Sequence, residues 1–246
     1  MIKTPQQIED MREGGKILAE ILQELVKAAK PGVATQDLDK LAAELILKFG
    51  VNPSFKGYMD FPAVLCTSIN DEAVHAVPSD RILKEGDLLK LDFGVVHKGL
   101  HTDAALTIIV GNKDDEKKKK LINVTKEALQ AGIAQARIGN TVGDIGNAIQ
   151  KVVEKNGFKV LKELGGHGVG EKLHEEPFIA NFGQHNEGEK LEVGMVIAIE
   201  PITAMSTWRI KDGSDGFALV TEDGSLSAHF EHTVAITEKG PKILTD

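Results

Sequence analysis

The chain repeats itself at long range, and this internal repeat limits the folds that it can adopt. The segment 32–50 matches 139–157, with glycines at both ends and apolar residues at equivalent positions between them. The run LKEGDLLKLDFG, 83–94, matches LEVGMVIAIEPI, 191–202, at the same offset to within one residue. A repeat of this length predicts a duplicated α+β unit and excludes a solenoid of short repeats.

The second match aligns two carboxylates, Asp92 and Glu200, at equivalent positions of predicted strands. Duplicated units commonly face each other across a pseudo-two-fold axis. We therefore expect a single domain with two similar halves, roughly 1–112 and 113–246, and a central cleft that receives both side chains.

Asp92 lies in a predicted hairpin, KLDFGVVHKGLHTD, which also contains Asp103. The flanking runs LLKLDF and LTIIV favour strands, and Lys98-Gly99 is suited to a two-residue turn. This turn places Asp92 opposite Ala105 and the two aspartates on one face, as diagonal neighbours roughly 7–8 Å apart. Such carboxylates resist ionisation unless a cation lies between them, although two aspartates on a solvated hairpin face give the same pattern.

Composition narrows the class of protein. The 246 residues are 41% apolar and 27% charged, which is ordinary for a globular protein, and the net charge of −8 argues against nucleic acid as the main partner. The single cysteine, Cys66, excludes an internal disulfide. The sequence has no signal-peptide pattern and no apolar run of membrane-spanning length, so we expect a cytoplasmic protein.

Four helices are predicted by apolar periodicity and by their end signals. The first begins after Thr4, which is followed by proline and by a capping-box glutamine, and it ends before Lys30-Pro31-Gly32. The others cover about 35–50, 116–135 and 141–156. The lysine run in the third is the solvated face of that helix.

The second half adds further residues of the kinds that bind metals, at strand or loop positions: His167, His174, Glu200 and Glu231. With the two aspartates they form a set of oxygen and imidazole donors, while Cys66 is not needed as a ligand. Four carboxylates and an imidazole can hold two divalent ions about 3.5–4 Å apart. Such a set suits manganese, iron, cobalt or zinc. Taken singly, each residue also fits a turn or loop role.

The motifs VHAVP, LDFG, HTD, GHGVG, LHEEP, IEP and FEHT occur in one order, and together they resemble the type I methionine aminopeptidases of the M24 metallopeptidases across essentially the whole chain. The resemblance implies the α+β pita-bread fold, with two pseudo-symmetric halves around a central antiparallel sheet and helices outside. It also implies hydrolytic removal of the N-terminal methionine from nascent proteins when the second residue is small, by a metal-activated hydroxide.

The resemblance also implies residue roles. Asp92 would chelate one metal, Asp103 and Glu231 would bridge both, and His167 and Glu200 would complete the other shell. Glu200 would also move the proton of the water. His75 and His174 match two pocket histidines that contact the substrate. The methionine side chain would be bound by Phe55, Tyr58, Phe61, Cys66 and Phe217.

Three positions depart from common family patterns: Leu173 stands where many members have an aromatic residue, Phe61 where tyrosine is frequent, and Phe217 where tryptophan is frequent. They bear on the shape of the pocket and not on the metal site. Two alternatives remain open. One is an Xaa-Pro peptidase of the same fold, and the other is a non-catalytic binding homologue. The family generally acts as a monomer, and the sequence leaves both the metal and any docking to the ribosome undetermined.

Overall fold

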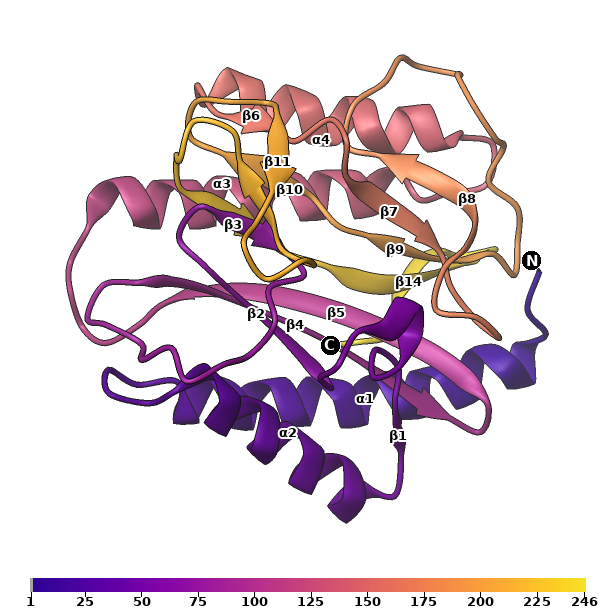
Figure 1. The fold of residues 1–246 in the computed structure, drawn as a ribbon. Coiled ribbons are helices and arrows are strands. Elements are labelled where there is room, and N and C mark those ends of the chain that lie inside the picture. Colours follow the sequence, from indigo (N-terminus) through magenta and orange to yellow (C-terminus); the bar gives the residue numbers. More distant parts are fainter. Residues whose placement is uncertain (1) are drawn as a thin grey trace.

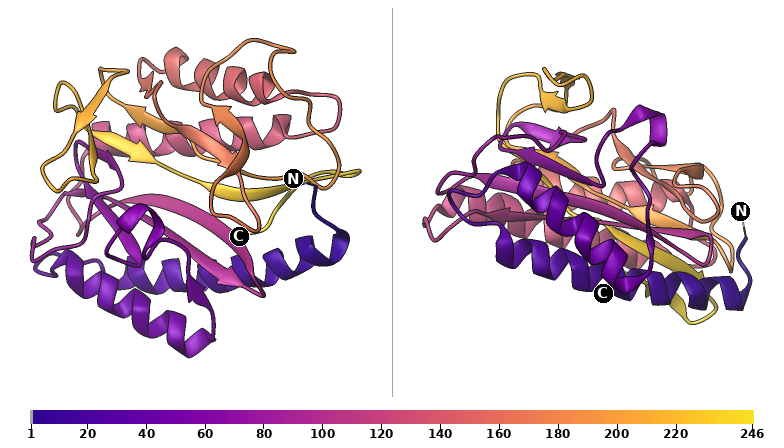
Figure 2. Two further views of the ribbon diagram at one scale, coloured as in Figure 1. Left: turned by 45° about the vertical axis from the view of Figure 1, so that its right-hand side comes forward. Right: turned by 60° about the horizontal axis from the view of Figure 1, so that its bottom comes forward.

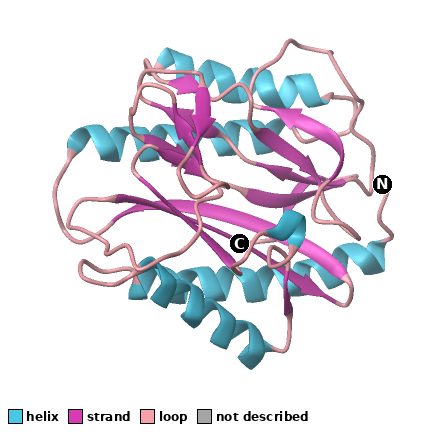
Figure 3. Ribbon diagram, in the orientation of Figure 1, coloured by secondary structure: helices cyan, strands magenta, loops and turns pink. Residues whose placement is uncertain are grey.

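The computed structural model describes residues 2–246, with helices on the outside and strands between them (Figure 1, Figure 3). The helices are α1 (Pro5–Ala28), α2 (Thr35–Phe49), α3 (Glu116–Gln135) and α4 (Val142–Lys155), with a 3₁₀ turn η1 (Tyr58–Asp60). The strands are β1 (Asn52–Pro53), β2 (Leu65–Ile69), β3 (Glu72–Val74), β4 (Leu88–His97), β5 (Leu100–Ile109), β6 (Lys159–Val160), β7 (Gly165–Gly168), β8 (Glu175–Ala180), β9 (Val196–Ile199), β10 (Ile202–Ala204), β11 (Ile210–Asp212), β12 (Leu219–Thr221), β13 (Ser227–His229), β14 (His232–Thr237) and β15 (Gly240–Ile243).

The helix starts follow the capping chemistry of the sequence. Thr4 caps α1: its hydroxyl accepts from the Gln7 amide N–H, and the Gln7 side chain accepts from the Thr4 N–H. Thr141 and Asp144 form the corresponding capping box of α4. Each box satisfies backbone donors that the first turn of a helix leaves without a partner. The four predicted helices are therefore confirmed, with ends that differ by no more than about two residues.

The aspartate hairpin has the register that its turn predicts. β4 and β5 pair antiparallel from Leu88 opposite Ile109 to His97 opposite Leu100, and Asp92 faces Ala105. The turn residues Lys98 and Gly99 have positive φ of 51° and 78°. A two-residue turn of this hand matches the twist of the strands, so local turn chemistry is enough to fix the register.

The two copies of the repeat have equivalent backbone features. Isolated β-bridges join Ala34 to Ile82 in the first half and Thr141 to Lys190 in the second. These pairs correspond under the sequence repeat. The turns that lead into β4 and β9 each place a glycine at positive φ, 86° and 90°. A pseudo-symmetric arrangement of the two halves follows from these pairs.

Each half has its own apolar core. In the first, α1 and α2 pack on the β4–β5 hairpin and β2, with Leu18, Leu38 and Phe93 in one buried cluster. In the second, α3 packs on strands that include β9 and β13, and α4 packs on β8, with Leu129 and Ile199 in another buried cluster. Figure 2 shows the helix pairs on opposite sides of the strands. Burial of these faces is the main stabilising contribution to the fold.

The halves join where β5 runs beside the segment that connects β13 to β14. The Glu231 amide donates to the Ala105 carbonyl at 2.9 Å, and the Thr107 hydroxyl donates to the His229 carbonyl at 2.8 Å. This seam continues the strands of one half into those of the other. It therefore brings carboxylates from both halves together. Across residues 2–246, no helix combines the length and apolar character that crossing a membrane requires.

Candidate metal centre

Five predicted ligands converge where the two halves meet. Asp92 and Asp103 come from β4 and β5, His167 from β7, Glu200 from the end of β9, and Glu231 from the link between β13 and β14. Their exposed fractions are only 3–9%. Buried ionisable groups are rare in proteins unless they are paired or bind a cation. Their convergence therefore indicates a site that binds a cation.

Two groups of three residues each have potential ligand atoms that lie within 4.8 Å of one another inside the group. One consists of Asp103, His167 and Glu231, and the other of Glu200, His229 and Glu231. Glu231 belongs to both groups. Asp92 is in neither group, but the charges of His229 and Glu200 act on its carboxylate, so it borders the same site.

Several polar atoms of the site have no hydrogen-bond partner among the described residues 2–246. Asp92 Oδ1, Asp103 Oδ1, Glu231 Oε1 and both ring nitrogens of His229 are buried in this state. A buried polar atom without a partner costs about 1–3 kcal/mol, so five at one place require a compensating group. Carboxylate oxygens and imidazole nitrogens are donors for divalent cations. The residues present thus fit a metal ion.

The electrostatics of the carboxylates support this fit. Burial raises the pKa of Glu200 to about 8 and that of Asp92 to about 7, the latter offset in part by His229. Burial, together with repulsion from the other carboxylates, raises the pKa of Asp103 and Glu231 well above their usual range. These carboxylates cannot all be ionised next to one another without a cation.

His167 is oriented for ligation by its own backbone neighbourhood. Its Nδ1 lies 2.9 Å from the Gly168 carbonyl, and because a carbonyl only accepts, Nδ1 carries the proton. Nε2 is then free and lies 3.6 Å from Glu200 Oε1. Burial lowers the pKa of His167 to about 3 and so favours the neutral imidazole that a metal needs.

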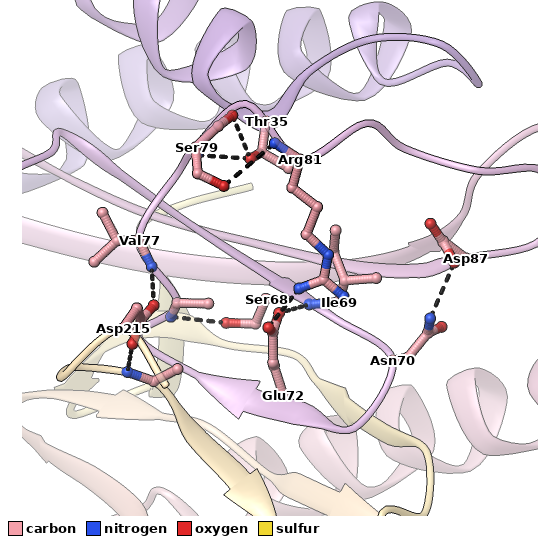
Figure 4. Close-up of polar contacts among 12 residues, drawn as sticks. Thr35, Ser68, Ile69, Asn70, Glu72, Val77, Ser79, Arg81, Asp87 and Asp215 are labelled. Atoms are coloured by element: carbon pink, nitrogen blue, oxygen red, sulfur yellow. Dashed lines mark hydrogen bonds and ion pairs between the residues drawn. The ribbon is translucent and has the colours of Figure 1, made fainter. Parts of the chain in front are cut away.

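Polar contacts hold the segment that follows His75 from two sides, and Figure 4 shows Val77, Asp215 and Ser68 among these contacts. The next amide, Ala76, donates to Ser68 Oγ at 3.2 Å, and the Val77 amide donates to Asp215 Oδ2 at 2.9 Å. His75 itself has a positive φ of 63°, a strained conformation for a residue with a Cβ. Desolvation of the ring is the main cause that lowers the pKa of His75 to about 4.

His174 contacts two other site residues. Its Nδ1 lies 2.7 Å from the Tyr58 hydroxyl, and its ring centroid lies 4.2 Å from that of His167. Desolvation lowers the pKa of His174, which keeps the ring neutral. Tyr58 thus stands at the edge of the site against a histidine, on the η1 turn.

Most of the residues predicted to bind a methionine side chain come together. Phe55, Phe61, Cys66 and Leu173 form one buried cluster, against which Phe217 packs. The rings of Phe61 and Phe217 meet edge to face with centroids 5.4 Å apart. Leu173 connects this cluster to the neighbouring His174.

A cavity of about 750 Å³ opens beside these groups. Its walls include His75, His167, His174 and Glu200, and four further glutamates are among its lining residues: Glu163, Glu171, Glu175 and Glu176. Lys172 also lines the cavity and Lys3 pairs with Glu175, but the glutamates outnumber these lysines, so the walls favour a cationic group. Cavity and carboxylate cluster therefore form one continuous site.

His229 is a site residue that the sequence motifs did not single out. It is 1% exposed and faces the same carboxylates as His167 does. The available signal was its spacing: His229 stands two residues before Glu231, which puts alternate side chains of an extended segment on one face.

Comparison with known proteins settles the family. The model of "Metallopeptidase family M24" matches residues 9–238. The chain belongs to metallopeptidase family M24. It is 48% identical to the methionine aminopeptidase of Clostridium acetobutylicum, over 100% of this chain and 98% of that protein. It is 46% identical to methionine aminopeptidase 1 of Bacillus subtilis, over 99% and 98%. This M24 chain is thus similar over its whole length to methionine aminopeptidases.

Solved M24 structures agree. The methionine aminopeptidase of Thermotoga maritima superposes with a TM-score of 0.97 at 44% identity, over 100% of this chain and 99% of that one. A prolidase from Pyrococcus horikoshii has a TM-score of 0.79 at 23% identity, which shows a shared fold alone. The predicted α+β pita-bread fold and the predicted methionine aminopeptidase family are confirmed. Family membership also implies a divalent metal.

Proposed function

We propose that this M24 chain hydrolyses the bond after the N-terminal methionine of nascent polypeptides whose second residue is small, with two divalent ions in the buried centre. The observation that carries the proposal is Glu231, which is shared between two groups of buried donors. A carboxylate shared in this way is suited to bridge two ions.

In this proposal Asp92 would help to hold one ion, Asp103 and Glu231 would be shared between the two ions, and His167 and Glu200 would help to hold the other. The partnerless oxygens of Asp92, Asp103 and Glu231 support these roles. Oxygen donors with imidazole are compatible with cobalt, manganese, iron or zinc. We further propose one catalytic domain with halves near 1–112 and 113–246, acting as a monomer in the cytoplasm, with the ribosome as a candidate docking partner.

Bound ions of this kind supply polarisation of a carbonyl and a lowered pKa of water. The protein's own contribution begins with Glu200, whose carboxylate would take the proton of the attacking water and pass it to the leaving amine. Burial raises the pKa of Glu200 to about 8 before any cation acts on it, so this carboxylate has a high intrinsic affinity for a proton.

His174 would donate a hydrogen bond from Nε2 to the carbonyl oxygen as negative charge develops there. This role requires the proton on Nε2, so that Nδ1 accepts from the Tyr58 hydroxyl at 2.7 Å. His75 would position the backbone of the substrate's second residue. The hydrogen bonds of the next two amides, Ala76 to Ser68 and Val77 to Asp215, support that role.

The acidic cavity and the apolar cluster support the choice of substrate. A free N-terminal amine is cationic, and glutamates around the cavity attract it. Phe55, Phe61 and Phe217 offer ring edges and Cys66 offers a soft sulfur, which suit a flexible thioether side chain.

The decisive experiment compares Asp103→Ala with Asp80→Ala, which removes an exposed carboxylate. Metal content and turnover of a Met-Gly-Met peptide are measured for both proteins. We expect Asp103→Ala to lose metal uptake and turnover, and Asp80→Ala to retain both. Normal turnover in Asp103→Ala would refute the proposed centre. Faster cleavage of an Xaa-Pro peptide than of Met-Gly-Met by the wild-type protein would refute the substrate instead.

A further inference from the structure

His229 is held in a fixed place beside the carboxylates. At the end of β13 its amide donates to Thr107 Oγ1 at 2.9 Å, and the same hydroxyl donates to the His229 carbonyl at 2.8 Å. One threonine of β5 thus fixes both backbone polar groups of this residue. The ring is directed into the interior, where its exposed fraction is 1%.

Neither ring nitrogen of His229 makes a hydrogen bond within the described part of the chain. Nε2 lies 3.3 Å from Glu200 Oε2 and 3.9 Å from Glu231 Oε2. The first distance is short enough for a hydrogen bond, yet the geometry does not make one. The carboxylate oxygen therefore lies beside the direction in which the ring nitrogen points, and that direction is left for another atom.

The distance between His229 Nε2 and Glu200 Oε2 is the one expected for two atoms that bind the same ion. Two donors at about 2.0–2.2 Å from a cation, at tetrahedral to octahedral angles, are separated from each other by roughly 3.0–3.6 Å. The separation of His229 Nε2 and Glu200 Oε2, 3.3 Å, falls in this range. The family ligand His167 has the comparable separation of 3.6 Å from Glu200 Oε1. By geometry, His229 qualifies as well as His167 does.

We propose that His229 is a further ligand of the metal centre, and that its Nε2 binds the ion that Glu200 and Glu231 hold. The three residues form one of the two buried donor groups, and the other contains His167. This inference rests on the proposed metal centre and extends it. The centre then has two imidazoles, which shifts its preference toward cobalt, iron or zinc relative to an oxygen-only site.

The first test counts imidazole ligands in the wild-type protein. The metal-stripped protein is labelled with ¹⁵N-histidine, loaded with Co²⁺ and studied by proton NMR for paramagnetically shifted ring N–H signals. Each imidazole bound through Nε2 gives one such signal from Nδ1–H. We expect two signals, of which His167→Gln removes one and His229→Gln the other. One signal, lost only in His167→Gln, would overturn the role of His229.

The second test measures affinity. Co²⁺ binding to stripped protein is followed by calorimetry for wild type, His229→Gln, His229→Leu and the control His232→Gln, whose ring bonds Thr245 Oγ1 instead of the carboxylates. We expect at least a tenfold weaker affinity for one ion in both His229 variants, by analogy with the roughly 10–100-fold cost of losing a supporting group, and wild-type affinity in the control.

The outcomes separate the two proposals. Wild-type affinity for both ions in His229→Leu would refute ligation by His229 while leaving the five-residue centre intact. Failure of the wild-type protein to take up Co²⁺ would refute the centre itself. If the His229 variants do not fold, the signal count in the wild-type protein decides.

Discussion

Asp103 and Thr233 bind each other across the seam between the halves: the Asp103 amide donates to Thr233 Oγ1 at 2.9 Å, and this hydroxyl donates back to the Asp103 carbonyl at 2.8 Å. One side chain of the second half therefore satisfies both backbone groups of a metal-site residue in the first. Both residues are buried, so water cannot replace the hydroxyl.

Thr233→Val should destabilise the fold and weaken metal binding together. Valine matches threonine in shape but leaves a buried N–H and C=O without a partner, which costs about 1–3 kcal/mol. Chemical denaturation of the stripped protein measures the first effect and calorimetric titration with Mn²⁺ the second. Thr233→Ser keeps the hydroxyl and should lie close to wild type. Equal stability of the valine and serine variants would contradict this reading of the seam.

The parts of the structure that the sequence predicts best depend on local chemistry or on the repeat. The register of β4 and β5 follows from the Lys98-Gly99 turn, and the start of α1 follows from Thr4 and Gln7. The approach of Asp92 to the second half was predicted by its alignment with Glu200, because pseudo-symmetry relates positions that are far apart along the chain.

Other features depend on contacts that leave no pattern in the sequence. The strands β11 and β12 have three residues each, too few for a period to be read, yet their loop holds Asp215 against the His75 segment. Tyr58 was predicted to line a methionine pocket, and its hydroxyl contact with His174 arises only from the course of the loop. His229 stands directly before the motif FEHT and outside it, so the motif does not identify it as a site residue.

Tyr58→Phe should lower kcat while leaving metal content unchanged. The variant keeps the ring but removes the hydroxyl that fixes the tautomer of His174. We expect a loss of roughly tenfold, part of the 10²–10⁴ that a positioned proton donor contributes. Steady-state kinetics in the His174→Gln background provides the control, because there the second change should have little further effect. Equal losses in both backgrounds would show that Tyr58 acts independently of His174.

Asp215→Ala should weaken substrate positioning through His75. The carboxylate accepts from the amides of Val77, Phe217 and Ala218, so one side chain ties the His75 segment to the Phe217 turn. Its loss should reduce kcat/KM roughly tenfold with unchanged metal affinity, because small displacements of positioning groups are costly. Asp212→Ala changes an exposed residue at the end of β11, beside the same loop, and should retain full activity. A kcat/KM equal to that of this control would show that Asp215 does not support substrate positioning by His75.

The stability conferred by metal should increase with pH. Burial raises the pKa of Glu200 from an ordinary 4.5 to about 8, and that of Asp92 from 3.8 to about 7. Between those values the metal-free fold retains protons that the unfolded chain has lost, so this contribution to stability is complete at low pH and disappears as pH rises. Bound cations compete with the same protons and remove the penalty.

Calorimetry with EDTA and with Mn²⁺ measures the difference in Tm, which should widen between pH 6.5 and 8 as the Glu200 carboxyl of the metal-free fold titrates. His167 and His229 are neutral in the folded protein over this range, because burial lowers the pKa of His167 to about 3 and that of His229 to about 4. Burial also lowers the pKa of Lys90 to about 7, and its opposing contribution is present with and without the ion, so it cancels in the difference. A difference in Tm that stays constant or narrows over this range would mean that the carboxylates are already ionised in the metal-free protein, and the buried cluster would then need another source of compensating charge.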